Sequence, residues 1–231
     1  MNDIKLIVFD VDGTLAETDD FYVEKGTALV KKVLPFLSEQ SASKIVRPPV
    51  MLGETLLHGF YRLLDIAGVD GVLSGFHKKV SVKSEYKYTE VAGMRQTLEI
   101  LSKKYKTGII TSGSRHSTAA FIEKFELKDL LGYVISAEDC KFIKPHPMPL
   151  LEMIRQADVK NEQCLMVGDT VWDALCARRA GTKIALVRSG FDSELLLKSM
   201  KADFLFDTVN DLPAILDEDE NAGRTKIACG D

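Results

Sequence analysis

From residue 106 onward, short apolar runs alternate with segments whose apolar residues recur at helical spacing. The apolar runs are residues 106–111, 133–137, 164–168, 183–187 and 203–206. The helical segments are residues 94–104, 116–126, 147–157, 172–180 and 192–200. Strands that alternate with helices indicate a parallel sheet with helices on both faces, and nearly continuous apolar runs are typical of its buried strands. The pattern predicts an α/β fold built on a doubly wound parallel sheet.

The N-terminal part of the chain departs from this alternation. A first apolar run, residues 4–9, is followed by residues 16–88, which contain helix-like patterns and no convincing strand. The helix-like stretches are residues 19–37, 41–46, 53–67 and 70–84. We interpret residues 16–88 as a helical cap inserted after the first strand. The α/β core would then comprise residues 1–15 and 89–216, and residues 217–231 would form a polar tail that frays.

Composition narrows the class of protein. The 231 residues, 45% of them hydrophobic, suffice for one sizeable core or a main domain plus a smaller one. A net charge of -4 gives no basic surface for nucleic acid. No apolar run approaches the ~20 residues of a membrane span, and the N-terminus lacks a basic signal-peptide region. The four cysteines form no C-x-x-C pair, so we expect reduced thiols and a cytoplasmic protein.

Chemically reactive side chains follow the apolar runs. They are Asp10, Asp12, Thr111, Ser112, Lys144, Asp169 and Asp173. The carboxyl ends of parallel strands meet along one edge of a sheet, where open α/β folds bind ligands. Asp10 and Asp12 are two residues apart in an extended segment, so their side chains leave on the same side. Gly13 then lets the chain turn without a Cβ.

The charges of these residues predict a cation. Asp10, Asp12, Asp169 and Asp173 carry four negative charges when ionised, and Lys144 returns one. Crowded carboxylates do not all stay ionised without compensation. A divalent cation with oxygen ligands, such as Mg²⁺, and one retained proton would bring the sum to zero. Such a site is ready to receive an anion.

The aspartate pair and the segment GIITSGSR each admit a different interpretation. An Asp-Gly sequence is by itself a common turn, and this alternative stays open for Asp10 and Asp12 alone. An EF-hand loop needs glycine at its sixth and glutamate at its twelfth position, but Gly13 is fourth and Phe21 twelfth. The segment GIITSGSR is not a phosphate-binding P-loop, because Arg115 follows Ser114 where that motif requires G-K-[ST].

Four motifs together resemble the haloacid dehalogenase superfamily, in its phosphatase branch. They are DVDGTL at residues 10–15, GIITSGS ending the second strand, KPHPMP at residues 144–149 and GDTVWD at residues 168–173. The match extends from residue 4 to about residue 208, and it implies a Rossmann-like core. The position of the inserted cap is similar to that in the subgroup of phosphoglycolate phosphatases, sugar-phosphate phosphatases and β-phosphoglucomutases. The chain departs from this subgroup in Ser112-Gly113-Ser114 and in Met148.

The resemblance implies roles for the two aspartates of the first motif. Asp10 would attack phosphorus and form an aspartyl-phosphate. Asp12 would protonate the leaving group and then activate water. Members that cleave carbon–halogen bonds carry tyrosine in place of Asp12, which argues against that activity here.

The resemblance also implies ligands for metal and phosphate. Mg²⁺ would be held by Asp10, the backbone carbonyl of Asp12 and Asp169, with Asp173 either reaching it through water or orienting Lys144. Phosphate would be bound by Thr111, Lys144 and the backbone N–H groups of Ser112 and Gly113. The candidates for contacting the rest of the substrate and setting specificity are Arg47, Ser112 and Arg115.

The expected function is therefore a Mg²⁺-dependent phosphatase, a hydrolase of phosphoric monoesters such as phosphoglycolate or sugar phosphates. Its partner would be a small phosphorylated metabolite, with no nucleic acid and no membrane. A phosphomutase of the β-phosphoglucomutase type and a catalytically silent metabolite-binding protein are the alternatives. The substrate and the oligomeric state are left open by the sequence.

Overall fold

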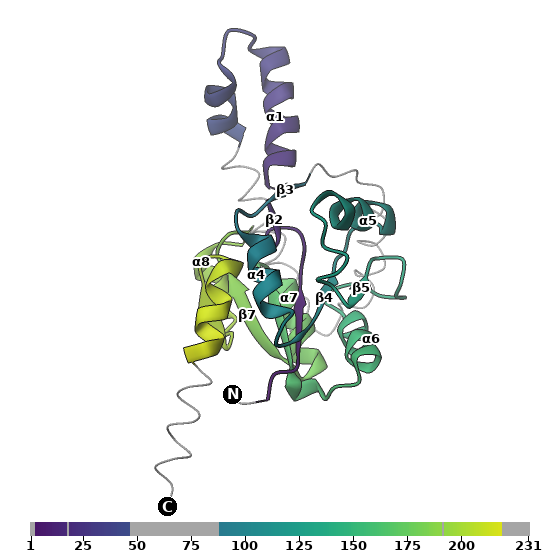
Figure 1. Cartoon of the computed structure of the whole chain (residues 1–231). Coiled ribbons are helices and arrows are strands. Elements are labelled where there is room, and N and C mark those ends of the chain that lie inside the picture. Colours follow the sequence, from purple (N-terminus) through teal and green to yellow (C-terminus); the bar gives the residue numbers. More distant parts are fainter. Residues whose placement is uncertain (1–2, 18, 47–87, 191, 219–231) are drawn as a thin grey trace, which may run out of the picture.

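The structure is a computed structural model that describes residues 3–17, 19–46, 88–190 and 192–218 (Figure 1). Its centre is a six-stranded sheet in the order β5-β4-β1-β6-β7-β8. The strands are β1 (Leu6–Phe9), β4 (Lys106–Ile110), β5 (Tyr133–Ile135), β6 (Cys164–Gly168), β7 (Lys183–Val187) and β8 (Phe204–Phe206). Every neighbouring pair in this sheet is parallel, which confirms the predicted fold class.

The strand order places the topological switch point of the sheet between β1 and β6. The chain runs from β1 outward through β4 and β5, and then crosses to β6, β7 and β8 on the other side of β1. This is the doubly wound order, in which the two halves of the sheet diverge from its middle. Ligands of such folds bind outside the carboxyl ends of the strands at this switch point. Asp10 directly follows β1, and Asp169 directly follows β6.

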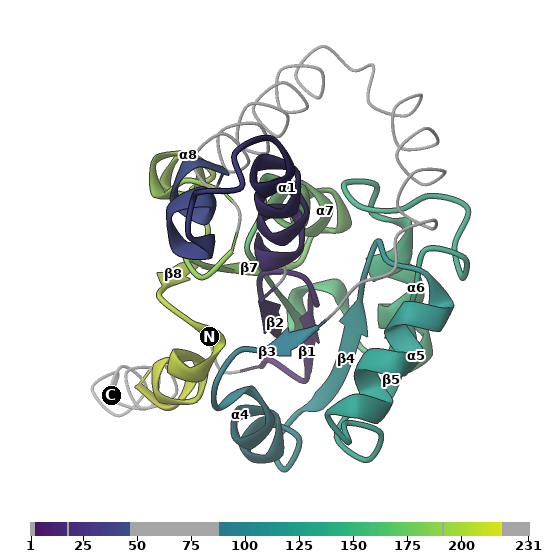
Figure 2. The same ribbon diagram turned by 90° about the horizontal axis from the view of Figure 1, so that it is seen from above.

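Helices cover both faces of the sheet. They are α4 (Met94–Leu101), α5 (Arg115–Lys124), α6 (Met148–Ala157), α7 (Val171–Ala180) and α8 (Glu194–Ser199). Seen from above, α4 lies on one side of the sheet and α7 and α8 on the other (Figure 2). Side chains of β1 alternate between two buried clusters, with Leu6 and Val8 in one and Ile7 and Phe9 in the other. The nearly continuous apolar runs therefore reflect burial on both faces.

The helix ends follow local sequence signals. Thr170 is the N-cap of α7, where its side chain accepts a hydrogen bond from Asp173 N–H while the Asp173 side chain accepts one from Thr170 N–H. Gly181 ends α7 in the left-handed conformation with φ 71°, which glycine adopts at little cost. Ser114 is the N-cap of α5 and accepts from Ser117 N–H.

The inserted segment differs from the prediction in two details. A short antiparallel pair joins it to the core: β2 (Ala16–Glu17) and β3 (Thr89–Glu90). We predicted no strand within residues 16–88, because a two-residue strand is too short to show an alternating pattern. The predicted helix over residues 19–37 is also shorter than expected, since α1 (Asp19–Val33) ends before Pro35. The residue before a proline disfavours helical geometry. Residues 39–46 form the helix that was predicted at residues 41–46.

The helix α1 extends away from the sheet (Figure 1). The predicted helices at residues 53–67 and 70–84 lie outside the described residues, so the extent of the cap stays a prediction.

At the other end of the chain, residues 212–218 are helical and Leu216 is buried against the sheet domain. The predicted polar tail begins at residue 217, near the end of this helix, and residues 219–231 are outside the described part, so the tail stays a prediction. No helix in the described ranges has the length and apolar character to span a membrane.

Candidate active site

The turn after β1 presents Asp10 at the centre of the sheet edge. Asp10 N–H donates to the carbonyl of Val167 at 2.8 Å, so the chain is still held by β6 as it leaves the strand. The chain then reverses through Gly13, whose φ of 81° is costly for residues with a Cβ. Gly13 N–H donates to the carbonyl of Ala16 at 2.8 Å, which closes the turn. The sequence D-V-D-G thus forms a tight turn as well as a site.

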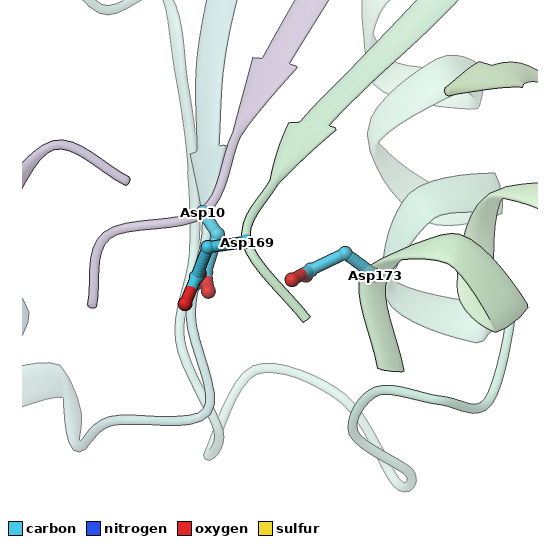
Figure 3. A group of neighbouring side chains, drawn as sticks. All are labelled: Asp10, Asp169 and Asp173. Carbon is cyan, nitrogen blue, oxygen red and sulfur yellow. The ribbon is translucent and has the colours of Figure 1, made fainter. Parts of the chain in front are cut away.

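Three buried carboxylates converge at this edge. Asp10, Asp169 and Asp173 each offer one oxygen, and the three oxygens lie within 4.8 Å of one another. Asp10 and Asp169 project side by side from the ends of their strands, and Asp173 points toward them from the start of α7 (Figure 3). Like charges this close and this buried repel strongly, so the group requires cations or protons.

Lys144 supplies one positive charge from the loop between β5 and α6. Its Nζ lies 2.6 Å from Asp10 Oδ1 and 2.7 Å from Asp173 Oδ1. Burial alone would lower the pKa of Lys144, but the two carboxylates outweigh it and raise that pKa, so the ammonium stays charged. The Lys144 loop is fixed by α7, because the guanidinium of Arg179 donates to the Pro145 carbonyl at 2.9 Å.

Hydroxyl groups orient two of the carboxylates. Thr14 Oγ1 donates to Asp169 Oδ1 at 3.1 Å, and Thr170 Oγ1 donates to Asp173 Oδ2 at 2.6 Å. Asp173 also accepts the Thr170 backbone N–H at 3.1 Å as part of the capping box of α7. One oxygen of Asp173 is therefore engaged by the helix start and the other by Lys144. This arrangement suits a residue that orients Lys144.

Asp12 lies beside this cluster in a different environment. Its Oδ2 accepts a long hydrogen bond of 3.5 Å from Thr111 Oγ1, and its Oδ1 is buried with no hydrogen-bond partner among the described residues. Burial raises the pKa of Asp10 to about 7 and the pKa of Asp12 to about 6, although Lys144 opposes both shifts. Both groups can thus exchange protons near neutral pH.

The loop after β4 faces the aspartates. Gly113 N–H donates to Thr111 Oγ1 at 2.9 Å, and Ser114 begins the turn into α5. Backbone hydrogen bonds hold this loop against β5 and the residues after it. Thr111 N–H donates to the Ile135 carbonyl at 3.0 Å, and Ala137 N–H donates to the Gly113 carbonyl at 3.0 Å. A loop of small residues at a helix N-terminus is suited to binding an anion.

A sequence profile described as haloacid dehalogenase-like hydrolase matches residues 7–187. The chain belongs to the haloacid dehalogenase-like hydrolase family. The resemblance inferred from the four motifs is confirmed, as is the prediction that the protein is a hydrolase.

Individual relatives of this haloacid dehalogenase-like hydrolase cover nearly its whole length. Pyrophosphatase PpaX of Bacillus cereus (strain Q1) is 27% identical over 216 residues, which is 93% of this chain and 97% of the relative. A structure described as a predicted phosphoglycolate phosphatase from Haemophilus somnus 129PT has a TM-score of 0.61 at 20% identity, covering 92% of this chain and 98% of that one. A HAD phosphatase from Thermococcus onnurineus has a TM-score of 0.58 at 24% identity, covering 92% and 98%. At these identities, the two structures support the fold.

The three residues predicted to contact the rest of the substrate lie in different environments in this hydrolase. Ser112 is half-buried in the loop after β4. Arg115 is largely exposed, and its guanidinium pairs with Asp139 at 2.5 Å, while its N–H donates to Glu138 at 2.7 Å. The charge of Arg115 is thus engaged by the loop after β5. Arg47 lies outside the described residues.

The site of this hydrolase also depends on Thr14, Ser189 and Gly190, which were not predicted from the sequence. Thr14 binds Asp169, as described above, and the loop after β7 contacts both Gly13 and Asp169. One signal was available for this loop, because Ser189 and Gly190 follow a predicted strand end, as the other site residues do. No charged residue type drew attention to them.

Proposed function

We propose that the protein is a Mg²⁺-dependent phosphatase that hydrolyses small phosphorylated metabolites through an aspartyl-phosphate at Asp10. The observation that carries this proposal is the buried convergence of Asp10, Asp169 and Asp173 with Lys144, next to a second carboxylate, Asp12. A site that only bound a metabolite would have no use for an acid beside the nucleophile. The family membership supports hydrolysis.

The donor set fits a hard divalent cation. Three buried carboxylate oxygens lie within 4.8 Å of one another. Mg²⁺ prefers negatively charged oxygen ligands of this kind. Asp10, Asp169 and the backbone carbonyl of Asp12 would hold it, while Asp173 would act on Lys144. When bound, the cation would neutralise charge between the carboxylate nucleophile and the phosphate.

Asp10 is positioned to act as the nucleophile. Lys144 holds Asp10 Oδ1 at 2.6 Å, which fixes the carboxylate and would attract an incoming phosphoryl group. In the first step, a carboxylate oxygen of Asp10 forms a bond to phosphorus as the bond to the leaving oxygen breaks. Positive charge on both sides of Asp10 would keep it ionised despite the burial that raises its pKa.

Asp12 is positioned to move protons. Its pKa of about 6 is raised by burial, and an arriving phosphate anion would raise it further. The protonated Asp12 would give its proton to the leaving oxygen. The resulting carboxylate would then take a proton from the water that attacks phosphorus, which releases phosphate and restores Asp10. Thr111, which donates to Asp12, and the Ser112 and Gly113 N–H groups would bind the phosphoryl oxygens.

The leaving group is the open part of this proposal. The similarity to Pyrophosphatase PpaX over nearly the full chain favours pyrophosphate as a second candidate substrate beside phosphate monoesters. A phosphomutase would need a second anion site, and the described residues around the carboxylates provide Lys144 and the loop after β4 for one phosphoryl group.

We further propose that residues 16–88 form the cap that contacts the leaving group, because α1 stands away from the sheet on the β2–β3 pair. The buried free thiols of Cys140, Cys164 and Cys176 suit a cytoplasmic protein.

A substrate panel tests the proposal. Phosphoglycolate, sugar phosphates, pyrophosphate and p-nitrophenyl phosphate would be compared by kcat/KM with Mg²⁺ and with excess chelator. We expect hydrolysis of at least one phosphorylated compound only when the cation is present, and none by Asp10→Asn. Asp129→Asn, which changes an exposed aspartate, is the matched control. Full activity in chelator, or turnover by Asp10→Asn, would overturn the mechanism.

A further inference from the structure

The loop after β7 forms one wall of the proposed metal site. It is fixed at two points to elements that carry site residues. Ser189 Oγ donates to the Gly13 carbonyl at 3.0 Å, and Asp192 accepts the N–H of Val171, the first residue of α7, at 2.7 Å. The loop thus connects the turn after β1 to the start of α7.

Gly190 lies directly against Asp169. A Cβ placed on Gly190 would overlap the Oδ2, Cγ and Cβ atoms of Asp169. The φ of Gly190 is outside the left-handed region, so the close approach alone requires glycine here. Gly13 approaches the same carboxylate, and its Cβ would also overlap Asp169 Oδ2. The Asp169 carboxylate is therefore in close contact with two glycine backbones.

Ser189 acts on the neighbouring peptide group. Gly13 N–H is bound to Ala16 at 2.8 Å, and the Gly13 carbonyl is bound by Ser189. Since the Asp12–Gly13 peptide is planar, the direction of the Gly13 N–H fixes that of the Asp12 carbonyl. With both of its polar groups held, Gly13 cannot rotate, and the Asp12 carbonyl keeps one orientation.

We propose that Ser189 and Gly190 are positioning residues of the metal site. Gly190 provides the space in which the Asp169 carboxylate points at the cluster. Ser189 holds Gly13, whose N–H belongs to the same peptide group as the Asp12 carbonyl, the backbone ligand. This inference rests on the proposed function, because it takes Asp169 and the Asp12 carbonyl as ligands. Groups that orient metal ligands typically change metal affinity by about 10- to 100-fold when they are removed.

Metal binding without substrate tests this inference. Mn²⁺ would be titrated into the full chain, and the free ion would be measured by electron paramagnetic resonance. We expect Ser189→Ala to raise the Kd for Mn²⁺ about 3- to 10-fold, as for the loss of one hydrogen bond that orients a ligand. Gly190→Ala should raise it more than about 10-fold, because the new methyl group displaces Asp169.

Two variants serve as controls. Ser102→Ala removes a hydroxyl that also donates to a backbone carbonyl, that of Glu99 at the end of α4. Gly132→Ala adds a methyl group that would meet only the Thr107 carbonyl, at an ordinary distance of 3.7 Å. Both should bind Mn²⁺ as the wild type does, and thermal unfolding in chelator checks that each variant is folded.

The outcomes separate this inference from the proposed function. Wild-type Mn²⁺ affinity in Ser189→Ala and Gly190→Ala, with binding lost in Asp169→Asn, would overturn the positioning role and leave the phosphatase proposal intact. An absence of Mn²⁺ binding by the wild type would overturn both. If Gly190→Ala does not fold, Ser189→Ala decides alone, and an unchanged Kd there refutes the proposal.

Discussion

The raised pKa of Asp10 predicts that the protein becomes less stable as the pH rises, provided that divalent cations are removed. Asp10 binds its proton more tightly in the folded protein, where its pKa is about 7, than in the unfolded chain, where its pKa is 3.8. The stabilisation is therefore fully present below pH 3.8 and is lost as the pH rises through 7. This sign is opposite to that of a salt-bridged surface carboxylate.

The magnitude follows from the two pKa values. A difference of about three pKa units corresponds to about 4 kcal/mol in total. About 2 to 3 kcal/mol of this is lost between pH 5 and pH 8, because Asp10 is already mostly ionised in the unfolded chain at pH 5. Asp139 has a lowered pKa, since hydrogen bonds from Ser136 and the pair with Arg115 outweigh burial, so it titrates below this window.

Urea unfolding in excess chelator measures the effect. The fluorescence of Trp172, the single tryptophan, reports the core because the residue is buried on α7. With a slope of about 2.5 kcal/mol per M, the unfolding midpoint should fall by about 1 M between pH 5 and pH 8. Asp10→Asn mimics the protonated side chain and should lose most of this dependence. The difference between the two proteins subtracts all other titrating groups.

Added Mg²⁺ should remove the part of the dependence that Asp10 contributes in the wild type, because a bound cation stabilises ionised Asp10 in the folded state. The exposed-site control Asp129→Asn should follow the wild type at every pH. A midpoint that is flat or rises from pH 5 to pH 8 in chelator would contradict the reasoning. So would an Asp10→Asn protein with the full wild-type slope.

Three further predictions concern the chemistry. Asp12→Asn should retain phosphoryl transfer from p-nitrophenyl phosphate but lose about 10²–10⁴-fold on alkyl phosphates, measured by rapid quench; equal losses on both would refute its role as the acid. Asp169→Asn should weaken Mg²⁺ binding in calorimetry while its unfolding midpoint in chelator stays equal or rises, because repulsion is relieved. Asp139→Asn frees Arg115 and loosens the loop that Gly113 belongs to, so KM for substrate should rise with little change in the pH profile; an unchanged KM would contradict this.

The sheet was predictable because its signal is distributed over many residues. The inner strands β1, β4, β6 and β7 are buried along most of their length on both faces, so whole apolar runs mark them, and Gly181 marks a helix end. The β2–β3 pair was missed because two residues cannot show a period. The helix at residues 212–218 was not predicted, because the buried Leu216 is followed by acidic residues that resemble a tail.

The site was predictable as far as charge and strand ends reveal it. Charged residues that follow apolar runs can be recognised in the sequence, as is the case for Asp10, Asp169 and Lys144. Ser189 and Gly190 carry no charge, and their importance depends on distances to Gly13 and Asp169 that only the folded chain defines. The same limit applies to Arg115, whose partner Asp139 is on a separate loop.

The spacing of the fourth motif has a geometric explanation. Asp169 ends β6, and Thr170 is the N-cap of α7, which makes Asp173 the third residue of the helix. A carboxylate at that position folds back to the N-cap N–H, as in any capping box, and so points toward the strand end that it follows. It therefore faces Asp169 at the switch point of the sheet and can bind Lys144 at 2.7 Å with its other oxygen. The four-residue spacing places two carboxylates in one site through the requirements of the helix start alone. A substitution of Thr170 would then act on Lys144 through Asp173, although Thr170 itself binds neither metal nor phosphate in the proposed mechanism.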